Sequence, residues 1–288
     1  MKKRTLIGII VAFSTVAIYA TCTDNVNLAN HKIKTTATEF ADNELVPKSY
    51  VANMIETNMK NLPKTITVQN GDVTETYGVI VYNGRAWFDR NLGATEAPKD
   101  WNDTNPNTWG ELHQWGKNRG PYAKRDSVVA GNCAGLQDKD NVSSDFHKGT
   151  DKAYDWVSNQ SGSCSNGLLT KGWWHDATAW DSDANRANGH NVCPAGWSVP
   201  SVEDFRSLNA NTPQEAFEKI KLNAAGWRDR NGNVNDLSNG TNGMYYWTST
   251  PANNEQIYFL HAREDVGVVM KRDYRANGMS IRCVKHLY

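Results

Sequence analysis

The sequence has no excess of charge of either sign. Its 288 residues include 31 Lys plus Arg and 31 Asp plus Glu, which gives a formal net charge of zero. Proteins that hold nucleic acid by its phosphates carry a basic surplus, and this chain has none. Nucleic acid is therefore not an expected partner.

Catalytic signatures are also missing. The chain has no Gly-x-Ser-x-Gly nucleophile elbow, no His-Glu-x-x-His zinc motif and no glycine-rich phosphate loop. Hydrolase and nucleotide-binding functions therefore have no support. We expect no enzyme activity and no cofactor.

No apolar run is long enough for a permanent membrane span. The run from Leu6 to Ala20 covers about 15 residues, whereas a spanning helix needs roughly 20. It follows the basic residues Lys2, Lys3 and Arg4, a pattern typical of a secretory signal peptide. We predict a signal peptide over 1–21 and an exported protein, placed at the cell surface or outer membrane, or otherwise periplasmic or secreted.

Cysteine is scarce and its count is odd, which is unusual for an exported chain. One cysteine needs a separate role, and Cys22 is either lipidated or removed with the leader. A lipidated Cys22 would anchor the protein in the outer membrane. Four cysteines then remain and permit two disulfides in three alternative pairings. They are Cys133, Cys164, Cys193 and Cys283.

Residues 22–75 contain few Trp and Gly and are interpreted as a helical stalk or linker. A helix is predicted from Tyr50 to Leu62, because its apolar residues recur at helical spacing. Such a stripe packs on the domain or on copies of itself, so self-association through this helix is one expectation. The stripe consists of Val51, Met54, Ile55, Met59 and Leu62.

The rest of the chain predicts an α+β fold with small antiparallel sheets, two helices and long loops. Asn83-Gly84 lies between two strand-like runs and indicates a hairpin. Ser201 caps one predicted helix, up to Leu208, and Thr212 caps a second, Pro213 to Ile220. The predicted closing strands are Tyr245–Thr250, Gln256–Leu260, Val266–Met270 and Met279–Val284.

Aromatic, amide and basic residues crowd the segment Tyr245 to Tyr274. Rigid aromatic rings give contact area at low entropy cost, and Asn, Gln and Arg adapt their hydrogen bonds to a ligand. Trp247, Ile257 and Phe259 are expected in the core. The candidate ligand-binding residues are Tyr245, Tyr246, Asn253, Asn254, Gln256, Tyr258, Arg263, Lys271, Arg272 and Tyr274.

Strand alternation selects one anchor within this segment. Ile257, Phe259 and His261 share one face, and the apolar weight of the first two predicts that this face points inward. Tyr258 on the other face is then the best single anchor. The outward set would be Gln256, Tyr258 and Leu260.

Metal-binding patterns are incomplete in this chain. Trp101-Asn-Asp103 is interpreted as a turn. Asp181–Asn185 and Asp229–Asn233 begin like calcium loops but lack the closing Glu, and we interpret the second as a hairpin turn. His175 and His190 with Cys193 match no zinc spacing. We therefore predict no metal site.

Several ordered blocks resemble the Fibrobacter succinogenes major paralogous domain. The opening blocks are Tyr77 to Leu92 and Trp109-Gly-Glu-Leu-His-Gln-Trp115, followed by Cys193-Pro-Ala-Gly-Trp-Ser-Val-Pro-Ser-Val-Glu-Asp-Phe205. The resemblance departs at Val199 and Phe205 and fails across about 117–189, which is interpreted as an insertion. The closing blocks are Ala225-Gly-Trp-Arg228, Tyr246-Trp-Thr-Ser249 and Ser280-Ile-Arg-Cys-Val-Lys285.

This resemblance implies a C-type-lectin-like domain over 76–288. In that fold a cysteine near the end closes onto the middle, which implies a Cys193–Cys283 disulfide and leaves Cys133 and Cys164 to staple the insertion. The closing region is also similar to the variable face of proteins targeted by diversity-generating retroelements. A weaker similarity, to formylglycine-generating enzymes, would require free reactive cysteines.

Together these features predict an adhesin-like protein that recognises an extracellular protein or glycan through its C-terminal sheet and loops. The alternative is a structural envelope or fibre component, including a phage-like receptor-binding tip. An oxidoreductase similar to the formylglycine-generating enzymes is the remaining and weaker alternative.

Overall fold

The computed structural model describes residues 8–12, 15–19, 53, 56–130, 145–149, 192–253 and 256–287. The protein is rich in sheet with few helices, and its sheets are antiparallel apart from the short parallel pair β7–β8. The predicted α+β class is confirmed at this level. No helix within the described ranges is long and apolar enough to cross a membrane.

The chain divides into two compact units. One comprises Met1–Leu62 with Asn83–Arg85 and His286–Tyr288, and the other Pro63–Tyr82 with Ala86–Lys285.

Strands β1 (Gly8–Ala12) and β2 (Thr15–Tyr19) of the first unit pair antiparallel. Asn53 and residues 56–60 are helical, inside the predicted helix, and Met59 is 43% exposed. Leu62 of the stripe is described and half-buried. Cys22, the predicted lipidation site, and the stripe residues Val51, Met54 and Ile55 lie outside the described ranges.

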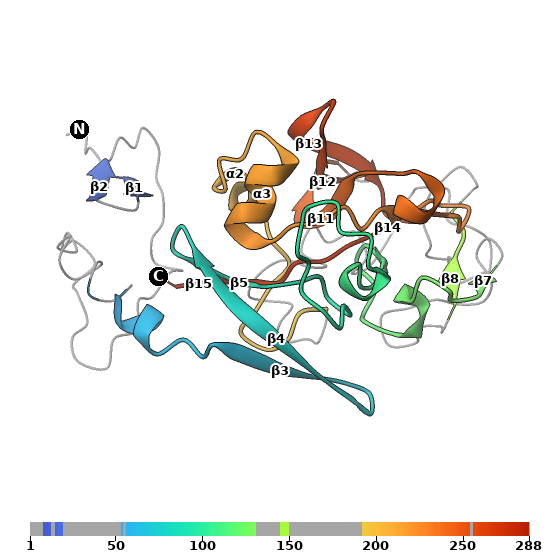
Figure 1. The fold of residues 1–288 in the computed structure, drawn as a ribbon, viewed down its shortest axis with the longest axis horizontal. Coiled ribbons are helices and arrows are strands. Elements are labelled where there is room, and N and C mark those ends of the chain that lie inside the picture. The colour runs from blue at the N-terminus through green and yellow to red at the C-terminus, as the bar shows by residue number, and fades with distance from the viewer. Residues whose placement is uncertain are drawn as a thin grey trace, which may run out of the picture. The chain divides into compact units, whose positions relative to one another are not determined.

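A four-stranded sheet is ordered β15-β5-β4-β3 (Figure 1). The Asn83-Gly84 hairpin turn is confirmed, since the two residues have φ angles of 47° and 70°. Strand β3 pairs with β4 from Thr65 onward, so this sheet begins before the domain boundary placed at 76. The strands are β3 (Thr65–Asn70), β4 (Val73–Tyr82), β5 (Arg85–Phe88) and β15 (Val284–His286).

Both predicted helices are present and capped as expected. Helix α2 (Val202–Arg206) starts with a capping box, in which the Ser201 hydroxyl accepts from the Asp204 backbone N–H. Helix α3 (Pro213–Ile220) has Thr212 as its N-cap, whose hydroxyl accepts from the Glu215 N–H.

The helices lie beside a three-stranded sheet ordered β11-β12-β13 (Figure 1). The three predicted strands of this region are confirmed, with β13 extending further than expected. The fourth prediction, one strand over Met279–Val284, is wrong, because only Met279 at the end of β14 and Val284 at the start of β15 lie in strands. The strands of the three-stranded sheet are β11 (Met244–Pro251), β12 (Gln256–Arg263) and β13 (Gly267–Tyr274).

The described residues also contain two further small sheets and short 3-10 helices. The predicted turn at Asp229–Asn233 is confirmed, because it connects β9 to β10 and Asp229 accepts from the Asn231 and Asn233 N–H groups. One sheet, ordered β10-β9-β14-β6, contains β10 (Val234–Asn235), β9 (Trp227–Arg228), β14 (Gly278–Met279) and β6 (His113–Gln114). The other contains β7 (Val129–Ala130) and β8 (Phe146–His147), and the 3-10 helices are Pro106–Thr108, Pro121–Ala123 and Leu237–Asn239.

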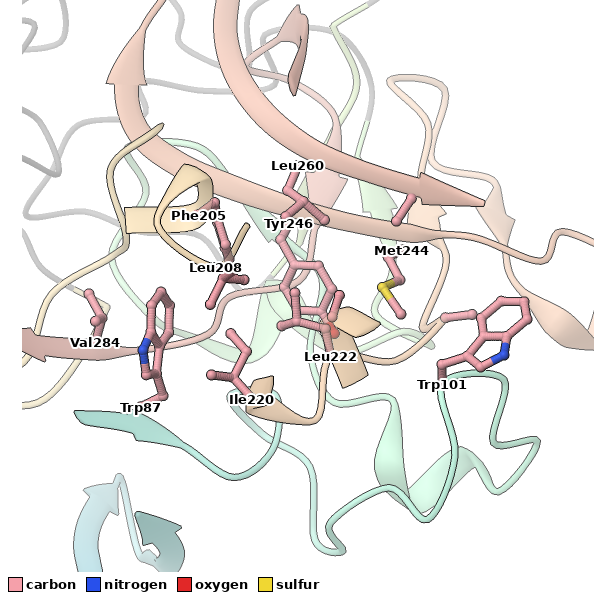
Figure 2. Close-up of a cluster of buried hydrophobic side chains, with 13 residues drawn as sticks. Trp87, Trp101, Phe205, Leu208, Ile220, Leu222, Met244, Tyr246, Leu260 and Val284 are labelled. Carbon is pink, nitrogen blue, oxygen red and sulfur yellow. The ribbon is translucent and has the colours of Figure 1, made fainter. Parts of the chain in front are cut away.

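The core fills the space between the helices and the sheet β11-β12-β13. Figure 2 shows Tyr246 at its centre, and the Tyr246 hydroxyl donates to Asn91 Oδ1 at 2.8 Å. Arg282 is also fully buried, and its guanidinium donates to the carbonyls of Phe88, Ile220 and Lys221 and to Asn91 Oδ1. A buried polar network thus joins distant loops to the apolar core.

The disulfide between Cys193 and Cys283 is confirmed, and it closes a loop of 90 residues. Cys133 and Cys164 lie outside the described residues, so their predicted pairing is untested. Two parts of the predicted insertion are held by packing, and not by a disulfide alone. Tyr122 and Phe146 are fully buried, and Leu112 N–H donates to the Ala123 carbonyl, so these parts belong to the folded body.

Candidate functional site

The sheet β11-β12-β13 presents two different faces. Residues that pair across antiparallel strands point to the same side, and side chains alternate along each strand. Tyr245 pairs with His261, which pairs with Val269, so these odd-numbered residues share one face. Tyr246, Leu260 and the other even-numbered residues point to the opposite face. We call the first the aromatic face and the second the helix face.

The helix face is covered by α2 and α3 over much of its length. Leu260, predicted to point outward, is fully buried there because the helices seal that side of β12. Tyr246 is likewise buried and hydrogen-bonded, so it is a core residue and offers no surface to a ligand. Farther along this face, Tyr258 lies opposite Arg272 and Gln256 opposite Tyr274.

A row of rings runs along the aromatic face from the core to the surface. Trp247 is fully buried and donates its indole N–H to the His113 carbonyl. Phe259 and His261 follow, with exposed fractions of 5% and 4%. The row ends at Tyr245 and Trp227, which are both half-buried.

Tyr245 connects the buried and exposed parts of this row. Its ring centroid lies 4.7 Å from that of His261 and 6.2 Å from that of Phe259. Its ring also stacks with that of Trp227 in β9, with 5.8 Å between the ring centroids and 28° between the ring planes. Trp227 is therefore the outermost ring of a stack whose inner members are fixed by the core.

Gly243 and Arg263 hold the edge of the Tyr245 ring. A Cβ atom at Gly243 would lie 2.9 Å from Tyr245 Cε2 and 3.1 Å from Arg263 Cγ, so both side chains pack on the bare glycine backbone. Arg263 forms a two-point ion pair with Asp265, with Nε–Oδ1 and Nη2–Oδ2 distances of 3.1 Å. The rim of the stack thus contains both hydrogen-bond donors and acceptors.

The rings carry no charge at neutral pH. Burial, followed by the positive charges of Lys271 and Arg263, lowers the pKa of His261 to about 4. Burial also raises the pKa of Tyr245, which the charge of Arg263 partly opposes. The surface is therefore an uncharged aromatic stack bordered by the Arg263–Asp265 pair, with exposed Lys271 farther along the same face.

The predicted ligand-binding residues do not form one cluster. Tyr245, Arg263 and Lys271 lie on the aromatic face. Asn253 lies in the loop before β12, where its side chain bonds to Gln256, and Asn254 is outside the described residues. The predicted burial of Ile257, Phe259 and His261 is confirmed. The predicted ligand-binding residues that are half-buried or exposed on the helix face are Gln256, Tyr258, Arg272 and Tyr274.

Trp227 is the surface residue that the sequence prediction missed. It belongs to a strand of only two residues, and no periodicity can be read from so short a segment. A signal was present in Gly226, whose φ of 71° and close approach to the Asn235 carbonyl require glycine. A glycine directly before a tryptophan can mark a ring placed by a tight backbone approach.

The described residues contain no site for the oxidoreductase or metal-binding chemistries considered above. Cys283 is bonded to Cys193 and is not a free thiol, which removes the residue that an enzyme similar to the formylglycine-generating enzymes would need. Trp101-Asn-Asp103 is a turn, in which Asp103 accepts from the Lys99 and Asn105 N–H groups. No group of three or more His, Cys, Asp or Glu residues that could hold a metal occurs in the searched ranges. Comparison of the chain with protein-family models, curated proteins and solved structures finds no match.

Proposed function

We propose that this protein is an exported, adhesin-like bacterial surface protein that binds an extracellular ligand through the aromatic face of its C-terminal sheet. The domain is proposed to have a C-type-lectin-like fold. Support comes from the Cys193–Cys283 disulfide, which closes the chain as the family resemblance implies, and from the antiparallel sheet within that loop.

The half-exposed stack of Trp227 on Tyr245 carries this proposal. Its inner rings are buried, so the outer pair is held rigidly and loses little conformational freedom when a ligand binds. Tryptophan, tyrosine and arginine are also the residue types that dominate binding energy at protein surfaces. The helix face cannot contribute to the same small contact, because its exposed residues point the opposite way.

Replacing Tyr245 with alanine is expected to weaken ligand binding by about 2–4 kcal/mol, since the stack would lose the ring that supports Trp227. The full mature chain would be screened on an array of defined glycans and immobilised extracellular proteins, and the strongest hit titrated by calorimetry. Val73→Ala is the matched control, because Val73 is 59% exposed on the β3–β4 hairpin away from this face.

The Tyr258→Ala variant tests, in the same assay, which face of the sheet binds the ligand. If Tyr258→Ala abolishes binding and Tyr245→Ala does not, the ligand occupies the helix face and our assignment is wrong. If the wild-type chain binds nothing on the array but assembles into regular polymers, the structural envelope or fibre alternative is favoured. The edge strand β3 would be the natural place for such assembly.

The proposed export leads to a separate prediction about the N-terminus of the mature protein. The basic start and the apolar run from Leu6 predict cleavage at Cys22 or within a few residues of it. Intact-mass measurement of the protein purified from bacterial envelopes checks this, and an acylated Cys22 would add the mass of its lipid chains. Retention of Met1 to Ala20 in the mature protein would contradict export by this leader.

A further inference from the structure

Within the described ranges, the polar groups of the outer stack differ from the indole N–H groups of three buried tryptophans. Trp109, Trp115 and Trp247 each donate their indole N–H to a backbone carbonyl at 2.8–2.9 Å. Among the residues that the structure describes, neither Trp227 Nε1 nor the Tyr245 hydroxyl has such a partner. The stack therefore presents a ring surface together with a donor and a hydroxyl that are available to a ligand.

The chemistry of the rim restricts the class of ligand. The Trp227 indole and the Arg263 guanidinium donate hydrogen bonds, the Asp265 carboxylate accepts them, and the Tyr245 hydroxyl does both. A sugar hydroxyl both donates and accepts, so it fits this mixture. A proline-rich segment offers mainly carbonyl acceptors, so it can use the donors of this rim but not its acceptors.

The charge of the surface further restricts the class of ligand. Arg263 is neutralised by Asp265, and His261 is neutral because its pKa is lowered to about 4. The exposed Lys271 and Glu264 carry opposite charges. A surface without net charge gives no advantage to an acidic ligand.

We infer that the aromatic face binds an uncharged saccharide, with one pyranose ring stacked on Trp227 and its hydroxyls bonded to Tyr245, Arg263 and Asp265. The C–H groups on the apolar face of a pyranose carry partial positive charge and match the negative face of the indole. This inference rests on the proposed function and assigns its ligand class. No metal takes part in this contact.

The test uses the full mature chain on an array that carries neutral oligosaccharides, sialylated and uronic-acid oligosaccharides, proline-rich peptides and extracellular proteins. We expect binding to neutral oligosaccharides. The dissociation constant should change less than about twofold between 50 and 500 mM salt, because no charge pair is formed. A chelator should leave it unchanged.

Variants of Trp227 supply the site-specific readout. Trp227→Ala should weaken binding at least about tenfold. Trp227→Phe keeps a ring but removes the N–H, and should cost about threefold to tenfold through the lost hydrogen bond. Tyr245→Phe should behave like Trp227→Phe, and Val73→Ala like the wild type. Thermal melting of each variant establishes that it is folded.

The outcomes separate this inference from the proposed function. Binding only to proteins or peptides, with loss in Tyr245→Ala, would overturn the saccharide inference and leave the proposed function standing. Binding only to acidic sugars, or neutral-sugar binding that Trp227→Ala leaves intact, would also overturn the inference. Failure to bind any member of the array would contradict both.

Discussion

Replacing both Cys193 and Cys283 with alanine is expected to lower the free energy of unfolding by about 4–5 kcal/mol. The crosslink closes a loop of 90 residues that contains α2, α3 and the whole sheet β11-β12-β13. Without it the unfolded chain gains the conformational freedom of that loop, and the folded state gains nothing in return.

Urea unfolding under non-reducing conditions measures this loss. Beside the disulfide, Ser198 and Val284 exchange two backbone hydrogen bonds of 2.8 and 2.9 Å, so the native connection should survive in the variant. The variant is thus expected to fold with a lower midpoint. Val128→Ala is the control, because Val128 is 68% exposed and its loss should change stability by less than about 0.5 kcal/mol. A loss below about 1 kcal/mol in the double variant would contradict the prediction.

Arg282→Met is expected to destabilise the domain by about 3–5 kcal/mol. The methionine fills part of the volume but removes the guanidinium donor from the carbonyls of Phe88, Ile220 and Lys221. Asn91 Oδ1 loses one of its donors and keeps the Tyr246 hydroxyl. An unsatisfied buried acceptor costs more than the net gain from a satisfied one. Arg282→Lys should recover only part of the loss, because one ammonium group cannot reproduce the forked geometry.

Arg272→Met is the matched control for this measurement, since Arg272 is exposed on β13. The denaturant midpoints of Arg282→Met, Arg282→Lys and Arg272→Met give the differences in unfolding free energy, provided that this free energy depends equally on denaturant concentration in all three. Equal stability of Arg282→Met and Arg272→Met would show that the buried network does not hold the loops to the core.

Local rules were sufficient to predict several elements from the sequence. Asn83-Gly84 and the caps Ser201 and Thr212 depend only on neighbouring backbone geometry, and all three appear as predicted. The disulfide of Cys193 with Cys283 followed from the order of the family-like blocks.

Non-local packing accounts for what the sequence could not show. Alternation predicted the side of β12 on which Leu260 lies, but not that helices would cover that side. Tyr246 resembled a surface tyrosine because its partner Asn91 is 155 residues away. Trp227 is a candidate binding residue only because it stacks on Tyr245, which belongs to a different sheet.

The position of β15 beside β5 has a consequence for the order of events during synthesis. Arg282 and Phe88, which flank this pairing, are 194 residues apart, so a central part of the core forms only after the last residues are available. Contacts of such long range fold slowly. In a nascent chain this part of the core would therefore remain unformed until β15 has been synthesised.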